Sequence, residues 1–182
     1  MKSTLHLSLP DFLLKRADGF VATHPEARMR EVISWSRENI TAGEGPFAAG
    51  VFDLDTGACV GAGVNRVVAS NCSPAHAEMM ALMFAQQQLG THDLSTRGRF
   101  VLTSSAQPCS QCFGALPWSG IRRLEFGADR EEVESIGFDE GPFSPNWRDQ
   151  LASRNIEVHG PLLGDEAAEV LRDYRHAGGP LY

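Results

Sequence analysis

Ser73-Pro74-Ala75-His76-Ala77-Glu78 and, further along the chain, Pro108-Cys109-Ser110-Gln111-Cys112 contain a histidine, an acid and a pair of cysteines. These are the side-chain types that a zinc site for hydrolysis needs, as metal ligands and as a proton carrier. The two stretches are far apart in the sequence, so they can share one metal ion only if the fold brings them together. We expect each stretch to open a helix that presents its polar residues to the other.

The cysteine pair is predicted to lie at the start of a helix that opens near Cys109 and stops at Gly120. The spacing of Cys109 and Cys112 puts both sulfur atoms on one helix face, about one turn apart. A helix N-terminus carries partial positive charge and free N–H groups, which favour thiolates. His76, at the start of another predicted helix, would supply the third ligand and leave a fourth position open for water. We therefore expect His76, Cys109 and Cys112 to bind one Zn²⁺ ion per chain.

Glu78 is the acidic residue of this predicted site. It is two residues from His76, close enough to take a proton from an activated water and return it to a leaving group. A closed structural zinc site is the alternative, with Cys72 or one of the remaining histidines as the fourth ligand. Redox use of the cysteine pair is a further alternative. Glu78 favours catalysis, because a structural site needs no such acid. Cys59, in a strand-like run, is expected to be a plain buried thiol.

The size and composition of the chain suit one domain. It has 182 residues, of which 42% are hydrophobic and 21% are charged, as in ordinary globular proteins. We expect a single domain over residues 1–182, with an N-terminal extension over about 1–25 and a C-terminal helix plus tail over about 164–182. No apolar run approaches the roughly 20 residues of a membrane-spanning helix, and a signal peptide is not expected. These observations predict a cytoplasmic protein that does not bind membranes.

The charge of the chain bears on its partners. The formal net charge is −7, the only lysines are Lys2 and Lys15, and no basic cluster exceeds Arg122-Arg123. Proteins that hold a nucleic-acid backbone usually carry a positive face. The composition therefore favours a small-molecule substrate over a nucleic acid.

Hydrophobic periodicity and turn residues predict helices that alternate with strands after an initial hairpin. Ser73 is a suitable N-cap for the helix that carries His76, and Pro74 suits its first position. Residues 137–147 are expected to form a loop. This order predicts an α/β fold, a three-layer α/β/α sandwich with a mixed, mainly five-stranded sheet. Strands are predicted at 47–53, 58–68, 99–104, 121–126 and 156–159, and helices at 25–41, 74–88, 109–120, 131–136 and 165–176.

The two motifs together resemble the cytidine-deaminase-like superfamily of zinc enzymes. The match is carried by His76-Ala77-Glu78 and by Pro108-Cys109-x-x-Cys112. The resemblance implies the zinc ligands named above, attack of activated water on a ring carbon that bears an amino group, and loss of ammonia. Glu78 would carry the protons, and the chain would have the cytidine-deaminase-like fold.

A closer resemblance, to bacterial guanine deaminases, covers most of the chain. It implies conversion of guanine to xanthine and ammonia by a homodimer, in which the C-terminal segment can be exchanged between subunits. The segments that carry it are Gly45-Pro46-Phe47-Ala48-Ala49, Asn65-Arg66-Val67, Cys72 to Glu78, Trp118-Ser119-Gly120, Ile136 to Pro142 and the terminal Leu181-Tyr182.

The resemblance also implies which residues contact the substrate. Asn65 would bond the edge of the base. Glu140 would be a second proton carrier, with its neighbour Asp139 as the alternative, and Tyr182 would cover the site. Guanine is deaminated at a carbon between two ring nitrogens, so two carboxylates at different places can divide the proton transfers. The substrate-binding residues expected are Phe47, Asn65, Ala77 and Trp118.

One departure from the guanine deaminase pattern leaves the preferred base open. Gln107-Pro108-Cys109 stands where the family usually has Glu-Pro-Cys, which can alter the groups that orient the metal ligands. Rival substrates are cytosine and an amino-triazine such as ammeline. A deaminase of adenosine in transfer RNA would use the same catalytic residues with a basic surface. A non-catalytic, zinc-stabilised binding module is the rival from another class of protein.

Overall fold

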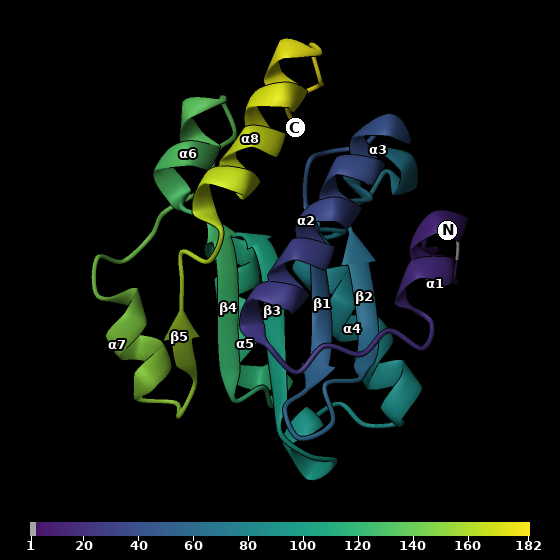
Figure 1. Ribbon diagram of the computed structural model, residues 1–182, viewed down its shortest axis with the longest axis vertical. Coiled ribbons are helices and arrows are strands. Elements are labelled where there is room, and N and C mark those ends of the chain that lie inside the picture. Colours follow the sequence, from purple (N-terminus) through teal and green to yellow (C-terminus); the bar gives the residue numbers. More distant parts are fainter. Residues whose placement is uncertain (1–2) are drawn as a thin grey trace.

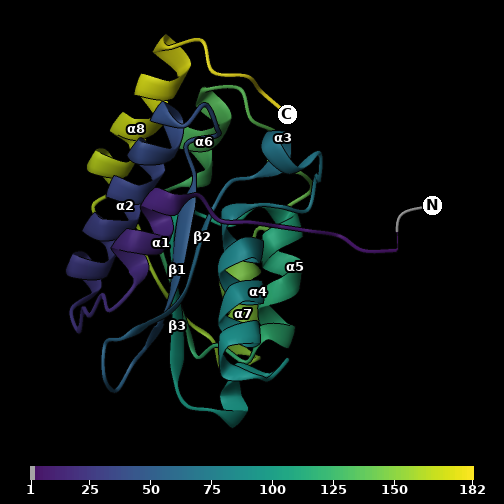
Figure 2. The same ribbon diagram turned by 90° about the vertical axis from the view of Figure 1, so that its right-hand side faces the viewer.

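The computed structural model describes residues 3–182, and within them a mixed β-sheet lies between two layers of helices (Figures 1 and 2). The five strands have the order β2-β1-β3-β4-β5. β1 pairs antiparallel with β2 and β3, whereas β3, β4 and β5 are parallel. The predicted three-layer α/β/α sandwich is thus confirmed. The strands are β1 (Ala48–Asp53), β2 (Cys59–Val64), β3 (Phe100–Ala106), β4 (Arg123–Ala128) and β5 (Glu157–His159).

The helices divide between the two faces of the sheet. α1, α2 and α8 cover one face, and α4, α5 and α7 cover the other (Figure 2). No helix within the described residues is long and apolar enough to span a membrane. The helices are α1 (Asp11–Ala17), α2 (Pro25–Thr41), α3 (Val67–Ser70), α4 (Ala77–Leu89), α5 (Ser110–Ser119), α6 (Arg130–Ser135), α7 (Trp147–Ala152) and α8 (Gly164–His176), with a short 3₁₀ turn η1 (Leu94–Thr96).

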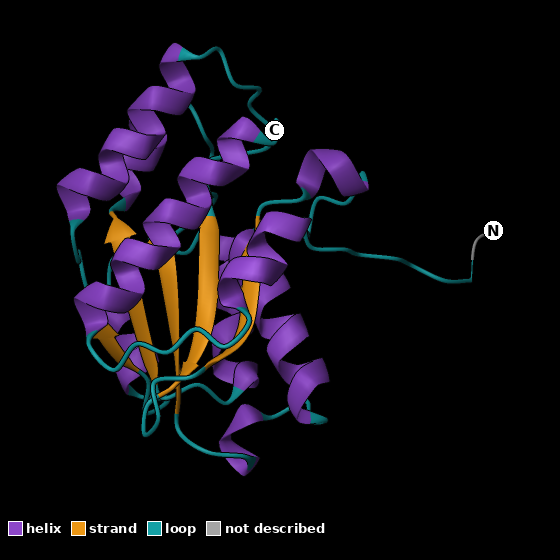
Figure 3. Cartoon of the chain, turned by 45° about the vertical axis from the view of Figure 1, so that its right-hand side comes forward, coloured by secondary structure: helices purple, strands orange, loops and turns teal. Residues whose placement is uncertain are grey.

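Strand direction brings the carboxyl ends of several strands to one edge of the sheet. Because β1 is antiparallel to both neighbours, β2 runs in the same direction as β3 and β4. Their carboxyl ends therefore share one edge, which is where α/β proteins commonly bind ligands. α4 and α5 both start at this edge and pack on the same face of the sheet (Figure 2), and Figure 3 shows the strands with helices on both sides. Two helix N-termini and three strand ends thus meet there.

Both faces of the sheet are packed, and α4 packs closest. Gly61 and Gly63 of β2 lie directly under it, and a Cβ at Gly63 would collide with the backbone of Ala77 and Ala81. On the opposite face, α2 is anchored by a buried ion pair between Arg28 and Glu125 of β4. This pair is bidentate, with N···O distances of 3.0 and 2.6 Å, so both charges are compensated.

Several sequence-based boundaries differ from the structure; β4, for example, lies two residues later than the strand predicted at 121–126. α4 begins at Ala77 with His76 as its N-cap, and not at Pro74, because the preceding residues close hydrogen-bonded turns (Ala75 N to Cys72 O, 3.0 Å; His76 N to Pro74 O, 2.9 Å). α5 begins at Ser110, with Cys109 as N-cap. The strand expected to reach residue 68 ends at Val64, and α3 follows it. Helix α7 starts within the span expected to be a loop.

Candidate active site

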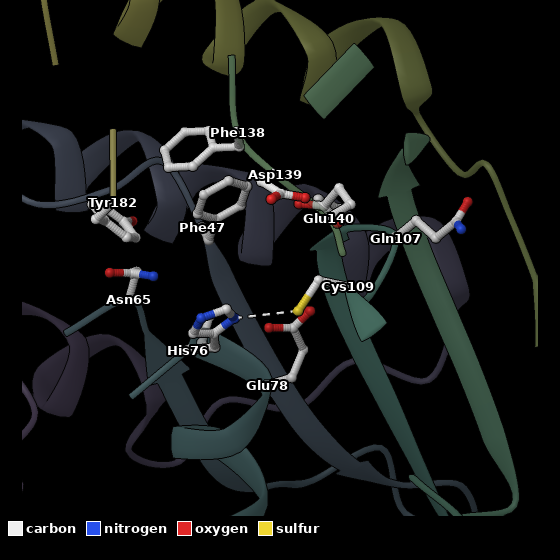
Figure 4. A pocket seen from close by; sticks show the side chains of 12 residues that line it. Phe47, Asn65, His76, Glu78, Gln107, Cys109, Phe138, Asp139, Glu140 and Tyr182 are labelled. Carbon is white, nitrogen blue, oxygen red and sulfur yellow. Dashed lines mark hydrogen bonds between the residues drawn. The ribbon is translucent and has the colours of Figure 1, made fainter. Parts of the chain in front are cut away.

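His76, Cys109 and Cys112 meet at the carboxyl edge of the sheet. His76 Nδ1 lies 3.5 Å from Cys109 Sγ and 3.6 Å from Cys112 Sγ, as Figure 4 shows for the first pair. A tetrahedral zinc shell with Zn–N of roughly 2.0 Å and Zn–S of roughly 2.3 Å holds nitrogen and sulfur about 3.5 Å apart. The three side chains therefore fit a zinc ion without rearrangement. Among the described residues 3–182, these three side chains form the one cluster of His, Cys, Asp or Glu that is arranged to hold a metal ion.

Two helix starts bring these ligands together. His76 and Cys109 are the N-caps of α4 and α5, both with extended backbone dihedrals, and Cys112 is buried in the first turn of α5. The unpaired N–H groups of a helix N-terminus favour negative charge on nearby sulfur. The cysteine spacing thus acts as predicted, although the helix begins one residue later than expected.

Without a metal, the Cys112 thiol interacts with both the Cys109 sulfur and the Glu78 carboxyl group. The pKa of Cys109 is lowered to about 4, chiefly because the Cys112 thiol donates a hydrogen bond to it. The pKa of Cys112 is raised, first because it is that donor and then because it is buried. Both shifts favour loss of the proton from Cys109 first, and zinc binding would displace the proton of Cys112.

Glu78 lies beside the ligands and is 7% exposed. Its Oε1 accepts a hydrogen bond from Ser104 Oγ at 3.2 Å, and its Oε2 accepts one from Cys112 Sγ at 3.4 Å. Burial raises the pKa of this carboxyl. A carboxyl with such a pKa, fixed next to the metal ligands, suits proton transfer. Ser104, on β3, was not singled out in the sequence because nothing local links it to the motifs.

A pocket opens beside Glu78 and His76 (Figure 4). Most residues expected to contact substrate line it, and so do several that the sequence did not point to. Phe138 is one of these: its ring lies 5.0 Å from that of Phe47 and 5.2 Å from that of Tyr182, edge to face in both cases. The lining residues are Phe47, Asn65, His76, Ala77, Glu78, Ala106, Gln107, Cys109, Phe138, Asp139, Glu140 and Tyr182.

The amide of Asn65 has a defined orientation. The residue is 2% exposed, and its Oδ1 accepts a hydrogen bond from Val67 N at 3.1 Å. A backbone N–H can only donate, so the amide oxygen must face Val67 and the NH₂ group is left for the pocket. Asn65 therefore presents a donor to a bound molecule.

The loop after α6 distinguishes Glu140 from Asp139. Glu140 is 7% exposed and lines the pocket, and its backbone O accepts a hydrogen bond from Ser110 N at 3.0 Å. Burial raises the pKa of Glu140 to about 8, with a further contribution from the negative charge at Cys109. Asp139 is exposed and its carboxylate accepts a hydrogen bond from Gly141 N at 2.8 Å. Both residues line the pocket, and burial favours Glu140 as the second acid.

Two expectations are corrected. Trp118 does not line the pocket: it is 73% exposed near the end of α5, with the Arg154 guanidinium 5.9 Å from its ring centre. The reason is that α5 runs away from the edge of the sheet on which its first turn lies. Cys59, expected to be buried, is half-buried, and its thiol donates to Gly61 O at 3.5 Å. Cys72, the alternative fourth ligand, is half-buried and outside the metal-binding group.

Residues 23–128 match the model of the cytidine and deoxycytidylate deaminase zinc-binding region. The chain belongs to this deaminase family. As a member, it is a zinc-dependent enzyme, and the ligand set described above is the zinc-binding part of the family's catalytic domain. The interpretation as a non-catalytic binding module is thereby set aside.

Three relatives define the chain's place within the deaminase family. The structure of guanine deaminase from Nitrosomonas europaea is 48% identical, covers 97% of this chain and 98% of that chain, and superposes with a TM-score of 0.93. A probable cytosine deaminase from Schizosaccharomyces pombe is 36% identical over 78% of this chain and 86% of the relative. Guanine deaminase from Bacillus subtilis is 31% identical over 63% and 71%. The similarity to the first therefore extends over almost the whole of both chains.

Proposed function

We propose that this protein converts guanine to xanthine and ammonia by hydrolysis. The observation that carries the proposal is the 48% identity with the Nitrosomonas europaea guanine deaminase over almost the whole of both chains. The pocket supports it, because Asn65, Glu140 and aromatic side chains surround the metal ligands in one small, mostly apolar space. Such a pocket suits a flat heterocycle with a few polar edges.

The chemistry divides between two carboxyl groups. Zinc held by His76, Cys109 and Cys112 would supply a Lewis acid that activates water near neutral pH. Glu78 would take the proton released from that water and deliver it to a ring nitrogen. Glu140, from another segment of the chain, would protonate the departing amine and then take back the proton that the new hydroxyl group on the ring carbon loses as it becomes a carbonyl. Water and guanine thus give xanthine and ammonia, with both carboxyl groups returned to their starting states.

The base would be recognised by one donor and by aromatic faces. The NH₂ group of Asn65 can donate to an oxygen or ring-nitrogen acceptor on the edge of guanine. Phe47 and Phe138 offer ring edges and faces against which a purine can pack. A base without an acceptor at the matching position would leave the buried amide unpaired, which discriminates strongly.

Cytosine is the second candidate substrate, because the probable cytosine deaminase of Schizosaccharomyces pombe is 36% identical to this chain. An amino-triazine such as ammeline is a third. The net charge of −7 argues against transfer RNA.

The test is ammonia release by the zinc-loaded protein from a panel of guanine, cytosine, adenine, guanosine, cytidine and ammeline. We expect guanine to have the highest kcat/KM. Inactivity on guanine with activity on cytosine would overturn the substrate and leave the reaction class standing. Inactivity on the whole panel, with zinc bound, would overturn both.

We also propose that the protein is a cytoplasmic homodimer. The dimer is what the resemblance to bacterial guanine deaminases implies. The free state of all four cysteines, each within the described residues, supports a reducing compartment. Sedimentation equilibrium should give twice the mass of one chain, and a single-chain mass would contradict the dimer.

A further inference from the structure

Three buried side-chain atoms lack a hydrogen bond, and their residues lie next to two segments that form one side of the pocket. Within residues 3–182, the buried side-chain nitrogen and oxygen atoms without a hydrogen bond are Asn39 Oδ1, Glu44 Oε2 and Arg66 Nε. Glu44 precedes Gly45, and Arg66 follows Asn65, so all three adjoin the two segments that form this side of the pocket. Buried polar groups are normally satisfied, so a concentration of exceptions calls for a functional reason.

Asn39 connects those two segments. It lies in the last turn of α2, fully buried, at the end of the helix that reaches the carboxyl edge of the sheet (Figure 1). Its Nδ2 donates to Gly45 O at 2.8 Å and to Asn65 O at 3.2 Å. Its backbone O accepts from Glu44 N at 3.1 Å. One side-chain amide therefore spans two segments that are far apart in the sequence.

Two further contacts join these segments, and one is an ion pair in which Arg66 Nη1 lies 3.9 Å from Glu44 Oε1. Beyond the end of the β1–β2 pairing, Asn65 N donates to Phe47 O at 3.0 Å. Past this point the chain turns into α3, and Asn65 Oδ1 takes the Val67 N–H. The clamp from Asn39 holds the backbone of Asn65 on one side while Val67 holds its side chain on the other. Together they direct the Asn65 NH₂ group into the pocket, where Figure 4 shows the amide near His76 and Tyr182.

We propose that Asn39 is a positioning residue for the substrate, which sets the orientation of Asn65 through the clamp on Gly45 O and Asn65 O. It does not itself line the pocket. The inference rests on the proposed function, since it concerns how the base is held. Asn39 keeps an unpaired Oδ1 because the carbonyls of both segments require a donor, and only an amide of this size supplies two N–H groups there.

A double-mutant cycle tests the proposal. Asn39→Leu removes the clamp with a side chain of similar size, and Asn65→Ala removes the amide that it positions. We expect Asn39→Leu to lower kcat/KM for guanine at least about tenfold, since small displacements of a binding group can cost up to about 100-fold. In the Asn65→Ala background the same substitution should change kcat/KM by less than about twofold, because interacting residues are not additive.

Controls separate positioning from loss of fold. Ser36→Ala, on the same helix, removes a buried hydroxyl that donates to Ile33 O and should leave kcat/KM unchanged. Zinc content and melting temperature are measured for every variant. If the Asn39→Leu variant does not fold, Asn39→Asp is used in its place, because aspartate has the same shape and lacks the two N–H donors.

Two results would overturn the inference: wild-type kcat/KM in a folded Asn39 variant, or losses that multiply in full in the double mutant. Failure of the proposed function has a different signature, because then the wild-type protein releases no ammonia from guanine. The cycle is in that case measured with the base in the panel that the wild type deaminates best.

Discussion

Glu78 is a buried acid beside the metal ligands, which is the position we propose for a proton carrier. It is buried next to Cys112 and Ser104 and is not itself a member of the metal-binding group. An amide side chain of the same shape could still accept the hydrogen bond from Ser104, so packing and hydrogen bonding do not require an acid here. The retention of an acid in a buried setting is therefore explained by chemistry and not by stability.

Glu78→Gln should keep the zinc and lose nearly all turnover. The amide has the same shape and can still accept from Ser104, but it cannot take a proton from water. We expect kcat for guanine to fall by about 10²–10⁴-fold, the usual contribution of a general acid–base. Zinc analysis and steady-state ammonia release on the same sample check this. Substantial turnover by the Glu78→Gln variant would remove Glu78 from the mechanism.

Glu140→Gln should impair turnover more than folding. Its carboxyl group has no protein hydrogen-bond partner among the described residues, so the amide should be tolerated structurally. We expect kcat to fall by about 10²-fold or more, with little change in melting temperature. Asp139→Asn is the matched comparison, because it keeps the acceptor for Gly141 N and should cause the smaller loss. The reverse order of the two losses would make Asp139 the second acid.

At the scale of elements, the site depends on how closely α4 lies on β2. Gly61 and Gly63 remove the side chains that would separate them, and α4 begins directly after His76. A helix held further from the sheet would carry His76 away from the cysteines of α5. The two glycines therefore do not bind the metal, but they let α4 lie close enough to the sheet to position His76.

Gly63→Ala should weaken both folding and zinc binding. The added methyl group meets backbone atoms of Ala77 and Ala81, which cannot rotate away. Overpacking of this kind costs about 1–3 kcal/mol, measurable by urea denaturation, and zinc affinity should fall with it. Gly114→Ala is the control: the position is exposed and open on α5, and alanine there should stabilise the helix by about 0.5–1 kcal/mol. Wild-type zinc affinity in a folded Gly63→Ala variant would show that the metal site does not depend on the close packing of α4 on β2.

At the scale of the whole molecule, residues before α2 join the main core. Leu13 of α1 is fully buried in a cluster with Trp35 and Phe52, and Val21 forms a β-bridge with Ala58. The segment expected as an N-terminal extension thus packs on the same sheet as α2. We propose that α1 and the sheet unfold together as one domain.

Removal of zinc should lower the stability of the whole chain. The ligands come from two helices that start far apart in the sequence, so metal binding and tertiary structure are coupled. A free zinc concentration about 1,000-fold above Kd would stabilise the fold by about 4 kcal/mol. Melting curves with and without a chelator measure this. Glu78→Gln should show the same zinc-dependent shift, whereas His76→Ala should show little; an equal shift in His76→Ala would place the zinc elsewhere.

Local patterns were sufficient to predict much of this molecule. The alternation of strands and helices predicted the layers, because hydrophobic periodicity depends on near neighbours in the chain. The motifs around His76 and Cys109 predicted a metal site, because few other sites need those residues at those spacings. The starts of α4 and α5 were wrong by a few residues at most, since the turns before them are hydrogen-bonded to distant backbone, as Arg66 N is to Ala75 O.

The sequence alone determined the fold class, the family and the kind of metal site, since each depends on patterns that a single segment carries. The tertiary structure alone decided how the pocket is assembled. It brought Phe138 against Phe47, favoured Glu140 over Asp139, left Trp118 at the surface and joined Asn39 to Asn65. The physical reason is that burial, hydrogen-bond partners and side-chain orientation depend on contacts between distant segments, which exist only once the sheet edge has formed.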